Sequence, residues 1–149
     1  MSFGKAVLGG LVGACALTLL NETTRQFVRD APRIDVLGKR AIAKPLMKMG
    51  IAPPKDDNLY WITLASDIFS NTLYYGSIGF GKEKNAYRNG AWLGLAAGIG
   101  AVALPAPLGI GKDTTARTAQ TELMTVAWYL AGGLAAAAVY QLLSDKSEN

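Results

Sequence analysis

The stretch "ELMTVAWYLAGGLAAAAVYQLL", Glu122 to Leu143, decides the fold class. A helix needs about 20 mostly apolar residues to cross a bilayer, and this stretch reaches that length. Its polar residues form no stripe wide enough to face water, as a helix on the surface of a soluble bundle requires. The charge of Glu122 favours the positive end of a helix that begins there. The stretch therefore predicts a transmembrane helix over 122–143.

Three further apolar stretches predict helices at about 3–24, 59–80 and 89–110. Pro105 and Pro107 are expected to kink or end the third helix, because proline has no backbone N–H. The first stretch, "FGKAVLGGLVGACALTLL", also fits a signal peptide. Its apolar run continues past Cys15, so we expect a retained helix. The sequence thus predicts an all-α, polytopic integral membrane protein: one membrane domain, residues 1–149, with four transmembrane helices.

The composition agrees with this class and excludes several kinds of site. Half of the 149 residues are apolar and 17% are charged, where soluble domains have about 25%. The mean hydropathy is +0.20. There is no histidine and only one cysteine, which argues against disulfides, metal sites and Ser-His or Cys-His catalysis. We expect no cofactor, no metal, no catalytic residue and no nucleic-acid partner, and an enzyme is the less favoured class.

The basic residues are concentrated in the first connection, 25–58, which carries eight of them. With four spans, the first and third connections share one side of the membrane, giving ten lysines and arginines against five. The positive-inside rule then predicts that these two connections are cytoplasmic and that both termini lie outside.

The first connection also carries a helical pattern. Ile34, Leu37, Ala41 and Ile42 lie near one face at helical spacing, and most basic residues lie elsewhere. One interpretation is a basic amphipathic helix on the membrane surface, attracted to anionic lipid by about 1 kcal/mol per basic residue. The other is an ordered cap packed on the helical bundle. The sequence favours neither.

A polar stripe runs along the helix expected over 59–80, with Asp67 near its middle. A charged aspartate at that depth costs about 2.5–3.5 kcal/mol on insertion scales, so it needs a cation, hydrogen-bond donors or a proton. Asn71 lies four residues on, where its side chain can meet Asp67. The candidate residues for binding a solute or ion are Thr63, Asp67, Ser70, Asn71 and Tyr74.

Two further sets of residues are singled out by their positions. Glu22, Arg25 and Glu122 lie at helix ends and form a candidate polar cluster near the membrane interface. Small residues at four-residue spacing allow close helix packing. These are Gly9, Gly13, Gly90, Gly94, Gly98 and Gly132. They indicate tight packing, and give weaker support to a homo-oligomer.

Three functions fit these patterns. The leading hypothesis is binding or translocation of a small solute or ion along the stripe. The second is a non-catalytic accessory or scaffold subunit of a larger membrane complex, in which the stripe joins helices. The third is a lipid-modifying enzyme. The expected partners are membrane lipids, with anionic lipid at the first connection, and either further copies of the chain or a membrane complex.

Overall fold

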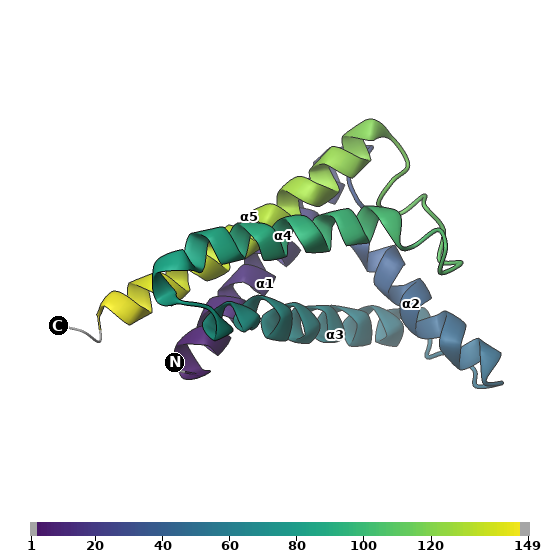
Figure 1. Ribbon diagram of the computed structural model, residues 1–149. Coiled ribbons are helices and arrows are strands. Elements are labelled where there is room, and N and C mark those ends of the chain that lie inside the picture. Colours follow the sequence, from purple (N-terminus) through teal and green to yellow (C-terminus); the bar gives the residue numbers. More distant parts are fainter. Residues whose placement is uncertain (1–2, 147–149) are drawn as a thin grey trace.

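All regular structure in residues 3–146, the range that the computed structural model describes, is helical. Four long helices are joined by a shorter helix and two 3-10 turns (Figure 1). The elements in chain order are α1 (Phe3–Phe27), α2 (Ile34–Lys48), α3 (Asp56–Gly76), η1 (Ser77–Phe80), η2 (Glu83–Asn85), α4 (Ala86–Ala103) and α5 (Ala119–Asp145).

Helix α5 is the centre of the packing. It packs closely against α4 on one side and against α1 on another, and α1 in turn packs against α3. In contrast, α3 and α4 contact each other little, and in Figure 1 they diverge toward the end of the molecule where α2 lies. The four long helices therefore form an open arrangement rather than a closed four-helix bundle.

Small residues make the two crossings of α5 possible. A Cβ atom added at Gly13 of α1 would lie 2.6 Å from the carbonyl oxygen of Gly132. One added at Gly98 of α4 would lie 2.8 Å from the Cα atom of Val126. Neither distance is possible for a real side chain, so the backbones approach as closely as in GxxxG-type packing. The predicted glycine stripes lie at contacts within one chain.

A matched pair of substitutions in α4 tests this packing. In Gly94→Ala the new methyl group would lie 2.7 Å from the α5 backbone, which should destabilise the protein by about 1–3 kcal/mol. In Gly100→Ala it would meet only the flexible Leu104 side chain at 3.6 Å, so the better helix propensity of alanine should give a gain of about 1 kcal/mol. Thermal unfolding in detergent measures both. Equal effects would contradict the close crossing.

Two of the helices, α1 and α5, are long and apolar enough to cross a membrane. The all-helical prediction is therefore confirmed, but within the described residues only two of the four predicted spans meet this criterion. Helix α3 does not meet the criterion because its polar stripe lowers its mean hydropathy. Helix α4 has Arg88 and Asn89 in its first turn and ends at Ala103, before Pro105, so its apolar stretch is shorter than the predicted 89–110.

The first and third connections lie together at one end of the molecule. Arg40 forms two hydrogen bonds with the Asp113 carboxylate, at 2.8 and 3.0 Å, and Arg117 pairs with Asp30 at 3.0 Å. The Arg33 backbone N–H donates to the carbonyl of Thr114 at 2.8 Å. The hydrogen bond from Arg40 lowers the pKa of the Asp113 carboxyl. These contacts bring α2 and the loop before α5 into one polar layer.

Helix α2 is packed on the bundle at its beginning and exposed at its end. Ile34 is buried, and Leu37 packs against the core formed by the long helices. Beyond these residues the helix extends away from the bundle (Figure 1), and Met47 and Met49 are exposed. The first turns thus form the packed cap that the sequence allowed. The later turns have the exposed apolar and basic surface expected of a helix at a membrane surface.

Candidate functional site

The polar stripe of α3 is divided between two spaces. Thr63 and Asp67 line a small polar cavity against α1. Ser70, Asn71 and Tyr74 line a larger groove between α3 and α4. Asn71 connects the two, because its side-chain amide donates to the Asp67 carboxylate at 3.0 Å. The stripe is therefore continuous, but its two halves have different surroundings.

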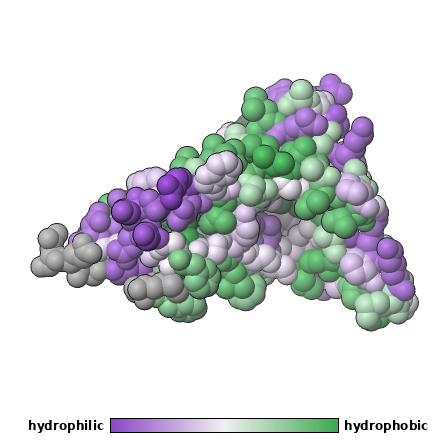
Figure 2. Space-filling view, viewed as in Figure 1, coloured by the Kyte–Doolittle hydropathy of each residue, from purple (hydrophilic) through white to green (hydrophobic). Residues whose placement is uncertain are grey.

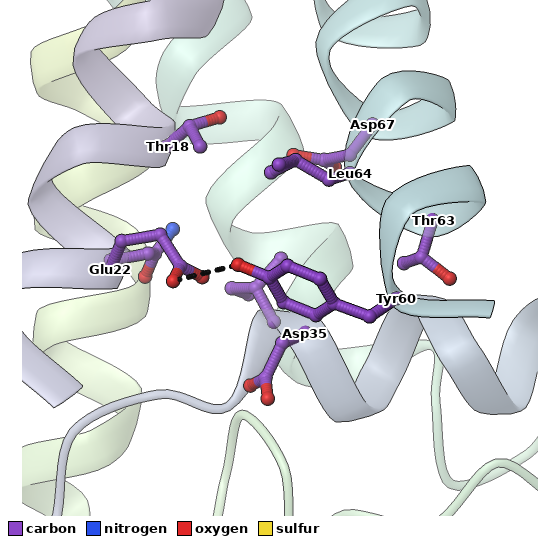
Figure 3. A pocket seen from close by; sticks show the side chains of 9 residues that line it. Thr18, Glu22, Asp35, Tyr60, Thr63, Leu64 and Asp67 are labelled. Carbon is purple, nitrogen blue, oxygen red and sulfur yellow. Dashed lines mark hydrogen bonds between the residues drawn. The ribbon is translucent and has the colours of Figure 1, made fainter. Parts of the chain in front are cut away.

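The polar cavity lies between α1, α2 and α3 and has a volume of about 20 Å³. That is room for one water molecule or an ion of similar size. In Figure 3, Tyr60 reaches from α3 to Glu22 on α1, and Thr18 lies opposite Asp67. The cavity is lined by Thr18, Asn21, Glu22, Ile34, Asp35, Tyr60, Thr63, Leu64 and Asp67.

Three residues that line this cavity have a side-chain oxygen without a hydrogen-bonding partner in residues 3–146. These oxygens are Oγ1 of Thr18, Oδ1 of Asn21 and Oγ1 of Thr63, and all three are buried. Asn21 and Thr63 are each only 5% exposed. A buried polar group without a partner costs about 1–3 kcal/mol, so such groups are uncommon in native structures. Three residues with such atoms line one cavity that is large enough for a water molecule or an ion.

The acidic groups of the cavity differ in how their charge is balanced. Arg25 donates to the Glu22 carboxylate from Nε at 3.0 Å, and Tyr60 donates to it at 3.1 Å. Asp35, whose side chain is 7% exposed, accepts two hydrogen bonds from Arg33, at 2.9 and 2.8 Å. Asp67 makes no ion pair within residues 3–146, and its carboxylate accepts a hydrogen bond from Asn71.

The Asp35 carboxyl has two opposing influences on its pKa. Burial alone would raise the pKa, but the hydrogen bonds and charge of Arg33, together with the charge of Arg25, outweigh burial and lower it. Asp35 is therefore ionised at neutral pH. The two arginines balance the charges of Glu22 and Asp35, which leaves Asp67 as the carboxylate of the cavity without a cationic partner in the described chain.

The groove between α3 and α4 has a volume of about 600 Å³ and a mainly apolar lining. Two of its polar side chains already donate hydrogen bonds: the Tyr74 hydroxyl donates to the carbonyl of Leu93 at 2.9 Å, and the Asn71 amide donates to Asp67. The other lining residues are Leu37, Ala41, Ser70, Ala96, Ala97, Gly100, Ala101, Leu104, Pro105, Leu108, Ile110 and Tyr129.

The predicted interfacial cluster is brought together in part. Glu22 and Arg25 form an ion pair at the cavity, whereas Glu122 is exposed in the first turn of α5. There Glu122 lines a separate surface depression with Ile99 and Val102, and no ion pair in residues 3–146 joins it to Arg25. The start of α5 does lie beside the end of α1, since the Thr121 hydroxyl donates to the carbonyl of Asp30 at 2.9 Å, but Glu122 lies on the side of α5 that faces Ile99 and Val102.

Sequence reasoning missed four residues of the cavity as site candidates: Thr18, Asn21, Asp35 and Tyr60. Thr18, Asn21 and Glu22 follow one another at helical spacing of three and one residues, so they share a face of α1. That pattern could have indicated a polar face opposite the α3 stripe. Asp35 gives no such signal, because it reaches the cavity only through the packing of α2 on α3.

Comparison with protein-family models, with curated proteins and with solved structures found no match for this chain. The functional proposal therefore rests on the geometry of the site. In residues 3–146 no group of three or more His, Cys, Asp or Glu side chains is arranged to hold a metal ion. The cavity instead offers hydroxyl, amide and carboxylate oxygens, the ligand types that hard cations prefer.

The ion pair between Asp35 and Arg33 predicts that the stability of the protein depends on pH. Because its folded-state pKa is lowered, its stabilising contribution is present at neutral pH and is lost as the pH falls below the ordinary carboxyl value of about 4. Asp35→Asn should lower stability at pH 7 by about 1.5–3 kcal/mol and should flatten the acid limb of the Tm profile. Asp57→Asn, which removes an exposed carboxylate, is the control. An unchanged acid limb in Asp35→Asn would contradict this role.

Proposed function

We propose that this chain is a multi-pass membrane protein in which α3 and α4 cross the bilayer beside α1 and α5. The support is their packing, since α3 lies along α1 and α4 along α5. Figure 2 shows hydrophobic surface over the middle of the molecule, between a hydrophilic end near the C-terminus and a hydrophilic edge along α2. Large apolar side chains of α3 and α4 are exposed, including Phe69, Leu73, Trp92 and Ile99.

Sidedness of labelling tests this arrangement. In a Cys15→Ala background, Lys48→Cys and Lys112→Cys place a thiol in the first and third connections, and Lys84→Cys places one in the second. Four spans with the basic connections inside predict that an impermeant reagent labels only Lys84→Cys in intact cells and all three after lysis. Labelling of all three in intact cells, or of none, would contradict the proposed topology.

We further propose that the protein binds a small monovalent cation in the polar cavity, as the binding step for movement of an ion along the α3 stripe. The observation that carries this proposal is that Thr18, Asn21 and Thr63, which line the cavity together with Asp67, each have a buried side-chain oxygen without a hydrogen-bonding partner in residues 3–146. A cation held in the cavity would give a partner to those of these oxygens that face it. It would also balance the one carboxylate of the cavity that no arginine balances.

The size and charge of the cavity support a single, singly charged guest. About 20 Å³ holds one ion without its hydration shell, so the protein oxygens would have to replace bound water. One uncompensated carboxylate matches one positive charge, since Glu22 and Asp35 are already balanced.

A cation-specific gain in stability tests the site. Raising Na⁺ or K⁺ in place of N-methylglucamine, at constant ionic strength, should raise the Tm of the purified protein. The gain should approach about 2.7 kcal/mol at one hundred times the dissociation constant. Asp67→Asn should abolish this gain. Ser70→Ala, which changes a stripe residue outside the cavity, should keep it.

Thr63→Val separates ion binding from structural packing. The variant keeps the shape of the side chain and removes a buried hydroxyl that has no partner in the part of the chain that the structure describes. Without the cation its Tm should be equal to or above that of wild type, and the gain on adding the cation should shrink. A loss of stability in cation-free buffer, with no cation effect in any variant, would contradict the proposal. That result would favour an accessory protein in which the stripe only joins helices.

A further inference from the structure

The groove between α3 and α4 continues toward a basic depression at the end of α2. The depression is lined by Lys44, Met47, Lys48, Leu108 and Gly109. Leu108 also lines the groove, so the two spaces adjoin at this residue. One continuous surface therefore begins with two lysines at the polar end of the molecule and continues with an apolar lining between the helices.

The two lysines are the basic groups of α2 whose charge is not balanced. Lys39 pairs with Asp56 at 2.9 Å, and Arg40 pairs with Asp113 at 2.8 Å. Lys44 and Lys48 make no ion pair within residues 3–146. They lie one helical turn apart, so both can approach one anionic group.

The apolar part of the groove offers little to a polar ligand. Ala97, Ala101 and Leu104 form much of the wall on the α4 side. The polar groups on the α3 side include Asn71 and Tyr74, and both already donate hydrogen bonds to other atoms of the protein. Such a mainly apolar surface suits a hydrocarbon chain, and the hydroxyls of Ser70 and Tyr129 are the polar groups of the lining for which residues 3–146 provide no hydrogen bond.

We propose that the groove binds one molecule of an anionic phospholipid. Its phosphate would lie between Lys44 and Lys48, and an acyl chain would follow Leu108 into the groove along α4. The inference rests on the proposed membrane insertion but not on the cation site. Charge complementarity at one end and an apolar lining at the other select a lipid with a charged head group over a neutral one.

Native mass spectrometry of the protein released from detergent micelles tests the proposal. Phosphatidylglycerol is the probe, and phosphatidylcholine is the neutral comparison. We expect one bound phosphatidylglycerol and weaker binding of phosphatidylcholine. The double variant Lys44→Ala/Lys48→Ala should bind phosphatidylglycerol roughly 30-fold more weakly, because it removes both basic residues that would attract the charged head group. Lys82→Ala/Lys84→Ala makes the same change of charge on exposed residues outside the groove, and should bind as wild type does.

A second pair of variants tests the apolar part. Ala96→Phe puts a large side chain into the groove, and Ala103→Phe puts one on another face of the same helix. Only Ala96→Phe should lose the bound lipid. Because Ala96 is already exposed, the change should leave the core intact, and an unchanged Tm without added lipid confirms this.

Several results would overturn the inference. Equal binding of the two lipids, or binding that survives the loss of both lysines, would exclude recognition of an anionic head group. A dimer that is lost in Ala96→Phe would assign the groove to a second copy of the chain. If no lipid binds while the Na⁺-dependent rise in Tm persists, the lipid inference is wrong and the cation site stands. If labelling shows no membrane insertion, neither the lipid inference nor the proposed movement of an ion through a membrane is supported.

Discussion

The close approach of α5 to both α1 and α4 is the contact on which the rest of the structure depends. Gly132 of α5 faces Gly13 of α1, and Gly133 faces Gly90 of α4, so one helix presents small residues to two neighbours. Attraction between helices at such crossings comes from many short van der Waals contacts, each of which fades over a fraction of an ångström. One added methyl group on either side would separate the backbones.

This arrangement leaves α3 and α4 without a close contact along most of their lengths. Helix α3 is held through α1, and the space toward α4 stays open as the groove. Because α3 meets polar side chains of α1 on one side and the groove on the other, its stripe serves two spaces rather than one. The polar cavity and the apolar groove are therefore both consequences of the two tight crossings.

The helices could be predicted from the sequence because apolar length and proline positions are local properties. Pro105 ends α4 as expected, and the four-residue spacing of Asp67 and Asn71 does produce a hydrogen bond. The cavity could not be predicted in the same way. Asp35 and Thr18 are far apart in the chain, and their meeting depends on how α2 turns back after Pro32. Glu122 and Glu22 both lie at helix ends, and these ends are adjacent, but position at an end does not say which side of the helix a residue occupies.

The central role of α5 also has a consequence for biosynthesis, because this helix leaves the ribosome after α1, α3 and α4. Gly9 and Gly13 of α1 therefore have no partner on α5 until the other three long helices have been made, and α4 waits for the same helix. Until then, α1 and α3 are the pair of long helices that can assemble extensively. Chains that stop short of α5 should therefore remain partly assembled, and are natural substrates for quality-control proteases.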